Sequence, residues 1–366
     1  MTAANSGIDG EGRGHMKRQA MRIAVGQFNE LTEEKLRFAA QIGVGGVQLN
    51  TPNLPGETHW EERDLRALVD KCAGHGLALE AIENVPVHFY HKAMLGLPGR
   101  DEQIERYRTT LRNMGRAGIP ILGYHFMPNS VWRTERLSPG RGGAGCTKFD
   151  MAEVAEHVGP ADVGRYIAKT DERNEALSAA MRERPEDAIT ADQMWDNYVY
   201  FIQAVLPVAE EAGVKMALHP DDPPVPALGG VARIFREPAG FKRAHALNPD
   251  SPSWGLDLCL GCCSEMPGGR ANVTEMIEFF GPRGKIFYIH FRDVQGVVPN
   301  FQECFIGEGN FDPAEVMLHL KRVGFQGFLL DDHVPHMDGD TVWNHRGRAH
   351  AIGYMQGLMR MGEQRA

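Results

Sequence analysis

The sequence predicts an α/β fold in which eight parallel strands close into a barrel. From Met21 onward, short apolar runs alternate with amphipathic helical stretches, which is the pattern of parallel βα units joined by right-handed crossovers. Eight such units follow one another, and each strand run of the C-terminal half ends at a polar side chain. We therefore expect a (β/α)8 TIM barrel, whose functional sites lie where strand C-terminal ends meet the βα loops.

The first four units lie in the N-terminal half, with strands expected at residues 21–27, 44–50, 77–83 and 120–126. Thr32 is a suitable N-cap for the first helix, and the two glutamates that follow it complement the helix dipole. The next helices are expected over residues 60–75, where Gly76 provides a left-handed stop, and over residues 101–117.

A long interruption follows the fourth strand, at residues 127–190. It contains a Gly-rich segment at 139–145 and a charged segment at 171–187. Because loops of this length inside a compact domain are usually functional, we expect an insertion that acts as a lid. The βα rhythm then returns with a helix over 191–212, and a helix over 346–361 closes the chain.

The domain organisation follows from composition and length. Residues 1–20 are polar and Gly-rich without an apolar signal core, so we expect a disordered N-terminal extension. Residues 21–366 are expected to form one catalytic domain, because α/β barrels often exceed about 250 residues as a single unit.

Charge and composition exclude several classes of function. Apolar residues make up 42% of the chain and charged residues 24%, which is enough for a sizeable core. A net charge of −9 without a basic block argues against nucleic-acid binding. No apolar stretch reaches the roughly 18 residues of a membrane span, and the six cysteines are too sparse for a disulfide framework. We expect a cytoplasmic protein and leave its assembly open, a homo-oligomer included.

Four residues of metal-binding type end successive strand runs. His219 ends Val-Lys-Met-Ala-Leu-His, Cys259 ends Trp-Gly-Leu-Asp-Leu-Cys, and His290 ends Lys-Ile-Phe-Tyr-Ile-His. Asp332 follows Phe-Leu-Leu-Asp, and we choose it over Asp331 because only one of two adjacent strand residues points inward and Asp332 lies closer to the loop. In one barrel these side chains would converge as the first shell of a divalent transition metal.

Each of these residues also has a structural interpretation when taken alone. A strand-end histidine is often a hydrogen-bonded structural residue, a buried cysteine is usually a small hydrophobe, and an acid at a strand end often caps the next helix. Cys259 and Cys262 form a C-x-x-C pair that could be half a zinc knuckle or a redox pair, but no second such pair exists. Four such residues on four successive strands favour the metal site.

Further candidates flank the predicted ligands. His333 directly follows Asp332, and an ordinary imidazole carries protons near neutral pH. Arg292 could clamp a substrate carboxylate or form a surface pair with Asp293. Asp257 shares strand parity with Cys259 and should point inward. The ends of strands three and four carry candidate polyol-binding groups, of which His125 could also donate a proton: Glu83, Asn84, His88, Tyr124, His125 and Asn129.

Several segments resemble the mannonate dehydratase family of bacterial hexuronate (glucuronate) catabolism. The Gly-Leu-Asp-Leu-Cys-Leu-Gly and Ile-His-Phe-Arg segments, at 255–261 and 289–292, are the most specific. The likeness extends from about Met21 to the C-terminus and includes segments 79–88, 95–101, 104–118 and 124–128. It implies a xylose-isomerase-like TIM barrel and a lyase that dehydrates the sugar acid D-mannonate to 2-keto-3-deoxy-D-gluconate.

The resemblance also implies site residues and a cofactor. The family's metal ligands fall on His219, Cys259, His290 and Asp332, and its acid–base pair falls on Asp332 and His333. The metal is typically Mn²⁺, although Fe²⁺, Co²⁺ or Zn²⁺ also suits this shell. The metal would stabilise the charge that develops when the C2 proton leaves, with His333 as one proton-transfer group and His125, Tyr124 or a metal-bound water as the other.

The chain departs from the family pattern after strand eight. Val334 stands where the family usually has glycine, and the family's catalytic loop tyrosine has no clear counterpart. Trp343 falls near its place, but an indole cannot exchange a proton as a phenol can, and Tyr354 lies deeper in the final helix. The alternatives are therefore a related sugar-acid dehydratase, a sugar isomerase or epimerase, and a non-catalytic relative that binds metal or sugar acid. Isomerases of this barrel type generally use Glu and Asp ligands, and Cys259 speaks against them.

Overall fold

The computed structural model describes residues 21–129, 131–154 and 189–363. The predicted N-terminal extension, residues 1–20, lies outside the described residues, as does the part of the predicted lid at residues 155–188.

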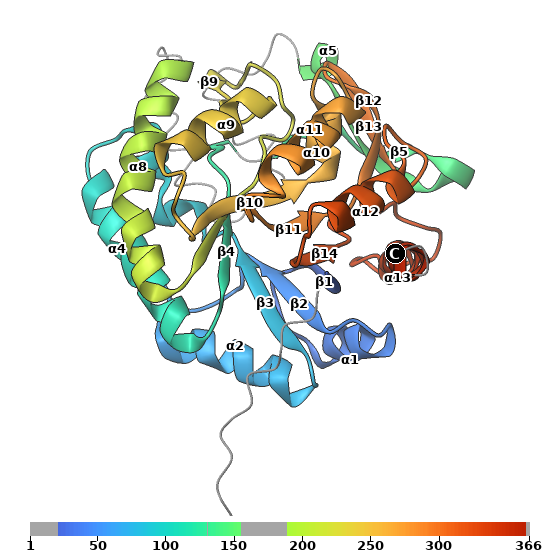
Figure 1. Cartoon of the computed structure of the whole chain (residues 1–366), viewed down its shortest axis with the longest axis horizontal. Coiled ribbons are helices and arrows are strands. Elements are labelled where there is room, and N and C mark those ends of the chain that lie inside the picture. The colour runs from blue at the N-terminus through green and yellow to red at the C-terminus, as the bar shows by residue number, and fades with distance from the viewer. Residues whose placement is uncertain (1–20, 130, 155–188, 364–366) are drawn as a thin grey trace, which may run out of the picture.

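Eight parallel strands close into a barrel, as the sequence predicts (Figure 1). Their order around the barrel is β1-β14-β11-β10-β7-β4-β3-β2. The strands are β1 (Arg22–Phe28), β2 (Gly46–Asn50), β3 (Ala78–Glu83), β4 (Ile121–Tyr124), β7 (Lys215–Leu218), β10 (Trp254–Cys259), β11 (Ile286–His290) and β14 (Phe328–Leu330). Because β7, β10, β11 and β14 are neighbours, the strand ends of the C-terminal half meet on one side of the barrel.

The barrel interior is filled by alternating small and large side chains. Ala24, Ala81 and Ala217 leave room for two large rings, Tyr288 and Phe328, which stack with centroids 4.9 Å apart. All five residues are buried. The interior is therefore a packed core, and a site can form only above it, at the strand ends.

Helices pack around the barrel (Figure 1). The longer ones are α1 (Glu33–Gln41), α2 (Glu62–Gly74), α4 (Arg100–Ala117), α8 (Ala191–Ala212), α9 (Pro238–Leu247), α11 (Arg270–Phe280), α12 (Pro313–Arg322) and α13 (His345–Glu363). Thr32 caps α1 as predicted, its hydroxyl accepting the Lys35 N–H, and Thr190 and Gln193 form a capping box on α8. None of the described helices is long and apolar enough to cross a membrane.

A second, four-stranded antiparallel sheet lies beside the barrel, in the order β12-β13-β6-β5 (Figure 1, upper right). It joins β5 (Glu135–Pro139) and β6 (Gly145–Asp150), from the predicted insertion, to the hairpin of β12 (Asp293–Val297) and β13 (Asn300–Cys304). The sequence analysis did not predict this sheet, because the strands of its two hairpins are short and about 150 residues apart. β12 begins three residues after His290, so the sheet is anchored at the predicted site.

Short elements complete the connections: η1 (Val87–Phe89), α3 (His91–Leu95), η2 (Arg141–Gly143), α5 (Met151–Val154), β8 (Ala227–Leu228), β9 (Val231–Ala232) and α10 (Leu260–Glu265). Helix α10 starts directly after Cys259, whose sulfur accepts the Cys262 backbone N–H at 3.4 Å. The end of β10 is therefore also the N-terminus of a helix, where anionic groups are favoured.

Candidate metal centre

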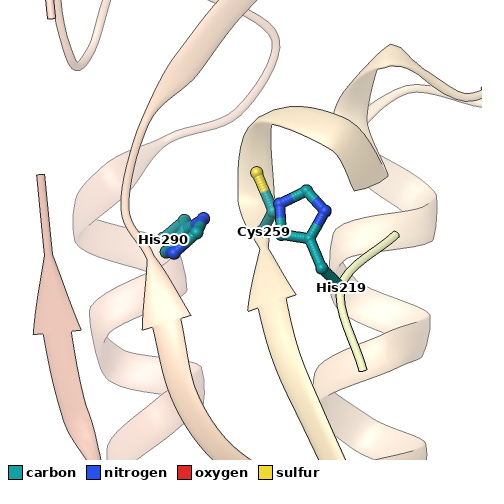
Figure 2. Close-up of side chains that lie close together, drawn as sticks. All are labelled: His219, Cys259 and His290. Carbon is teal, nitrogen blue, oxygen red and sulfur yellow. The ribbon is translucent and has the colours of Figure 1, made fainter. Parts of the chain in front are cut away.

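Three predicted ligands converge at the C-terminal ends of neighbouring strands. His219 follows β7, Cys259 ends β10 and His290 ends β11, and all three are buried. Each offers one ligand atom, and these atoms lie within 4.8 Å of one another. Figure 2 shows the three side chains lying close together at the ends of their strands.

Asp332 joins this group from the loop after β14. Its Oδ2 lies 3.4 Å from His290 Nδ1 and 4.0 Å from Cys259 Sγ. The adjacent Asp331 serves a different purpose, because its carboxylate accepts hydrogen bonds from Arg348 Nη1 at 2.6 Å and from the Gly26 N–H at 3.3 Å. Asp332 has a left-handed backbone, with φ of 49°, a conformation that costs energy for a non-glycine residue and is concentrated at functional sites.

The two imidazoles are held so that one nitrogen of each faces the cluster. His219 Nδ1 lies 2.6 Å from the Pro220 carbonyl; the carbonyl only accepts, so Nδ1 carries the proton and Nε2 is left for a ligand. His290 Nε2 lies 3.2 Å from Glu83 Oε2 and 3.4 Å from Asp257 Oδ2, and Nδ1 faces Asp332. Carboxylates behind a histidine fix the ring and make it a better metal ligand.

The charges in this cluster are those of a cation site. Burial alone would lower the pKa of His219, but the charges of Asp257 and Cys259 raise it to about 10. Burial opposes ionisation of Cys259, yet its hydrogen bond with Cys262 and the charge of Arg292 hold its pKa well below the usual range. Burial also opposes ionisation of Asp332, and His290 reverses this and lowers its pKa. Protons on the imidazoles therefore balance the anionic ligands, and a metal ion can replace them.

The residues fit a divalent transition metal. Sulfur, imidazole nitrogen and carboxylate oxygen are the donor types that such ions prefer. His290 Nδ1, the nitrogen that faces the cluster, is buried and makes no hydrogen bond of good geometry to a described residue. Buried polar groups are almost always satisfied, so this nitrogen fits a ligand to a cation.

Arg292 lies beside this cluster, completely enclosed by protein groups. Its Nε donates to Asp332 Oδ2 at 2.8 Å, its Nη1 to Glu265 Oε1 at 2.9 Å and its Nη2 to Asp222 Oδ2 at 2.9 Å. Cys262 Sγ lies 3.1 Å from the same Nη2. A substrate carboxylate would have to compete with these partners, so the geometry favours a role for Arg292 in holding Asp332.

His333 is more accessible than the four predicted ligands, with 37% of its side chain exposed. Its Nδ1 lies 2.8 Å from Glu303 Oε1, and its Nε2 lies 3.7 Å from Asp332 Oδ1. Burial would lower the pKa of His333, but Asp332 and Glu303 raise it. The imidazole therefore stands between solvent and the predicted ligands.

The predicted residues on strands three and four are placed differently from one another. His125 is buried near His219, and its Nδ1 accepts the Met127 N–H at 3.2 Å. Burial, with the charge of His219, lowers the pKa of His125 to about 3. Tyr124 points away from the barrel interior, toward α8, where its hydroxyl lies 3.2 Å from that of Tyr198. The structure therefore brings His125, and not the Tyr124 ring, to the site.

Asn84 and His88 follow β3 and have different surroundings. Asn84 is adjacent to Glu83, with Nδ2 of the amide 3.4 Å from Glu83 Oε1. Its backbone φ of 61° is left-handed. His88 lies in η1 and lines a small outer cavity of about 160 Å³ with Gln103 and Arg106 of α4. Asn84 thus lies in the carboxylate network behind His290, and His88 lies farther out.

Trp343, near the place of the family's loop tyrosine, lines a larger cavity of about 790 Å³ at the ends of β1 and β2. Its indole N–H donates to the Gln27 carbonyl at 3.1 Å. The Gln27 side chain also lines the cavity and donates to Glu83 Oε2 at 3.1 Å. This volume is in the range of small-molecule sites. Tyr354 is on the outer face of α13, 36% exposed.

Sequence reasoning missed four charged residues of the site, one of which is Glu265 at the end of α10. Of the other three, Glu303 comes from β13, Asp222 from the loop after β7, and Arg133 from the segment before β5. Arg133 Nη2 donates to both acids at 2.8 Å. The only sequence signal for Glu303 was the pair of short strand runs around Pro299 and Asn300, a turn pattern. For Arg133 and Asp222 we find no signal in the sequence.

Comparisons with known proteins agree with this geometry. A family model described as D-mannonate dehydratase (UxuA) matches residues 21–365. The chain is 32% identical over 335 residues to mannonate dehydratase 2 of Halalkalibacterium halodurans, covering 90% of this chain and 93% of that protein. It is 33% identical over 337 residues to the mannonate dehydratase of Enterococcus faecalis, covering 86% and 89%.

Solved structures give the same result. The mannonate dehydratase from Streptococcus suis serotype 2 superposes with a TM-score of 0.81 at 30% identity, covering 94% of this chain and 96% of that one. An L-ribulose 3-epimerase superposes with a TM-score of 0.56 at 14% identity, covering 94% and 96%. The second likeness shows the barrel fold alone.

Proposed function

The chain belongs to the D-mannonate dehydratase family, and from this premise we propose that it dehydrates D-mannonate to 2-keto-3-deoxy-D-gluconate. One observation carries the proposal beyond family membership. Imidazole, thiolate and imidazole ligand atoms lie within 4.8 Å of one another at the strand ends, with a carboxylate beside them. That donor set supports a hydro-lyase whose substrate is a hydroxy acid bound at a cation.

We assign the metal to His219, Cys259, His290 and Asp332, with Mn²⁺ as the expected ion and Fe²⁺, Co²⁺ or Zn²⁺ as alternatives. When bound, the ion would act as a Lewis acid toward the negative charge that develops next to the substrate carboxylate. Glu83 and Asp257 would hold the His290 ring from behind. Arg292 would keep the Asp332 carboxylate in place through its 2.8 Å hydrogen bond.

The reaction removes a proton from C2 and hydroxide from C3, which leave together as water. His333 is the proposed proton carrier, because it is next to Asp332 and accessible to solvent. His125 is the proposed second group. Its Nδ1 accepts the Met127 N–H, so the proton of the neutral ring is on Nε2, which can donate a hydrogen bond to the departing C3 oxygen.

Substrate contacts by Asn84, His88, Tyr124 and Arg292 stay predictions. The geometry favours Asn84, whose Oδ1 makes no hydrogen bond to a described residue. Tyr124 is less favoured, because its hydroxyl is in contact with Tyr198.

The test is turnover of a panel of aldonic acids by metal-loaded protein, with the 2-keto-3-deoxy acid measured as product. We expect D-mannonate to be dehydrated in the presence of Mn²⁺. His333→Asn should retain the metal, with kcat lower by about 10²- to 10⁴-fold, the usual contribution of a proton-transfer group. Full turnover by His333→Asn would remove the proton-transfer assignment, and wild-type protein that converts no aldonic acid would remove the proposed function.

A further inference from the structure

We propose that Glu303, on the second sheet, is a positioning residue that fixes the orientation of the His333 imidazole. The inference rests on the proposed proton-transfer role of His333. It assigns the second sheet a part in the reaction, because β13 supplies the one side chain that is hydrogen-bonded to this imidazole among the described residues.

The geometry determines which nitrogen of His333 is available. Glu303 Oε1 lies 2.8 Å from His333 Nδ1, and a carboxylate can only accept, so the proton of this hydrogen bond is on Nδ1. The other nitrogen, Nε2, is then directed to the side of the predicted ligand Asp332, 3.7 Å from its Oδ1. With Nδ1 bound, only Nε2 is left to exchange a proton with substrate.

His333 needs such a partner because its surroundings restrain it weakly. It lies on a loop, and 37% of its side chain is exposed. A ring in that environment can turn about its side-chain bonds, whereas catalysis requires a reacting nitrogen that stays in one place. Glu303, which is 4% exposed, is the rigid side of the pair.

Glu303 is itself held from two directions. Arg133 Nη2 donates to Glu303 Oε1 at 2.8 Å, and Arg292 Nη1 lies 3.5 Å from the same oxygen. Arg133 Nη2 also donates to Asp222 Oδ2 at 2.8 Å. Backbone pairing of Glu303 with Val294 in the β12–β13 hairpin fixes the position of its Cα. The position of the Glu303 carboxylate is therefore fixed by groups other than the His333 imidazole.

A purely structural ion pair between Glu303 and Arg133 is the competing explanation, and a double-mutant cycle distinguishes the two. Glu303→Gln has nearly the shape of glutamate, so it should fold. Its neutral amide accepts from Nδ1 more weakly than the carboxylate and can turn its NH2 group toward the ring, so the imidazole is no longer fixed in one orientation. In the wild-type background we expect kcat to fall about 10- to 100-fold, the loss that is usual when the partner orienting a metal-binding histidine is changed. KM for D-mannonate and metal content should stay within about twofold.

The second half of the cycle repeats the change in the His333→Asn background. If Glu303 acts through His333, Glu303→Gln should then lower kcat by less than about twofold, because interacting residues are not additive. Equal losses in both backgrounds, or no loss in the wild type, would overturn the inference. Should Glu303→Gln not fold, Glu303→Asp, which keeps the charge and withdraws the carboxylate, is measured in the same cycle and judged by the same criterion.

The matched control is Glu308→Gln. This acid pairs with Arg141 and its side chain is 26% exposed, so the same charge change there should leave kcat unaltered. A failure of the inference can be told from a failure of the proposed function. If wild-type protein dehydrates D-mannonate but the two substitutions are additive, only the role of Glu303 is wrong. If no aldonic acid is converted, the proposed function is wrong.

Discussion

Two buried clusters at the same end of the barrel each combine a cysteine with two other groups of metal-ligand type, but one contains histidines and the other contains acids. In each cluster, three ligand atoms lie within 4.8 Å of one another. The first, which we call the imidazole cluster, consists of His219, Cys259 and His290, and the second consists of Asp222, Cys262 and Glu265. The second surrounds the Arg292 guanidinium, which hydrogen-bonds both of its acids at 2.9 Å. We call it the Arg292 cage.

The difference between the clusters is the source of the positive charge. In the Arg292 cage the protein provides a permanent cation, since a guanidinium stays charged at every relevant pH. In the imidazole cluster the nearby positive charge is carried by titratable rings, which can lose their protons to an incoming ion. Proximity of ligand types therefore does not by itself make a metal site; the cluster must also be able to give up its own cation.

The strongest test of the difference between the two clusters is a matched pair of cysteine substitutions. Cys259→Ser should lose the metal and reduce turnover by more than about 100-fold, because even partners behind the ligands are worth about 10- to 100-fold. Cys262→Ser changes the Arg292 cage instead, so this variant should still bind the metal at the imidazole cluster. Elemental analysis of both proteins, with the aldonic acid assay, is the measurement. Equal metal loss in the two variants would mean that the clusters are not distinct.

Replacing Arg292 tests whether the Arg292 cage depends on its own cation. Arg292→Met leaves Asp222, Glu265 and Asp332 buried without it, and breaking such a pair costs about 3–5 kcal/mol of unfolding free energy. Urea unfolding measures the loss. The control is Arg141→Met, whose side chain is 54% exposed and whose ion pair should be worth less than about 1 kcal/mol. A similar small loss in both would show that the cage is not held by its arginine.

A smaller effect is expected from Asp257, the acid behind the proposed metal ligands. Asp257 is fully buried, with Oδ2 3.4 Å from His290 Nε2. Asp257→Asn should weaken metal affinity by about 10- to 100-fold while leaving all four ligands in place. Competition with a chelator measures the affinity. Asp293→Asn, at a buried acid that accepts backbone N–H groups, should leave it unchanged, and an equal loss in that control would contradict the assignment.

The smallest expected effect is a pH dependence of the unfolding free energy that arises from Glu303, which lies beside the Arg292 cage. Burial opposes ionisation of Glu303, but His333 and Arg133 lower its pKa below the ordinary 4.5. A carboxyl with a depressed folded pKa adds stability that is present above pH 4.5 and lost as pH falls through the folded value. Below pH 4.5 the unfolding free energy of the wild type should therefore fall more steeply than that of Glu303→Gln. Parallel curves would exclude this contribution.

Much of the fold was predictable because barrel strands carry a local signal. Apolar runs ending in polar residues identified the eight strands, and strand parity predicted that Asp257 and Cys259 point inward together. The same reasoning separated Asp332 from Asp331, which binds Arg348 on α13. Local sequence did not show that the hydroxyl of Tyr124, the last residue of β4, lies against Tyr198 of α8, and its substrate contact stays a prediction.

The sequence by itself determined the barrel and the four side chains at its C-terminal strand ends, because each depends on a periodicity or position within a few residues. Only the tertiary structure decided what surrounds them. Arg133, Asp222 and Glu303 are brought together from segments separated by as many as 170 positions, and no local pattern encodes such a meeting. The enclosure of Arg292 by acids has the same origin, since the charge that an arginine faces depends on every segment folded against it.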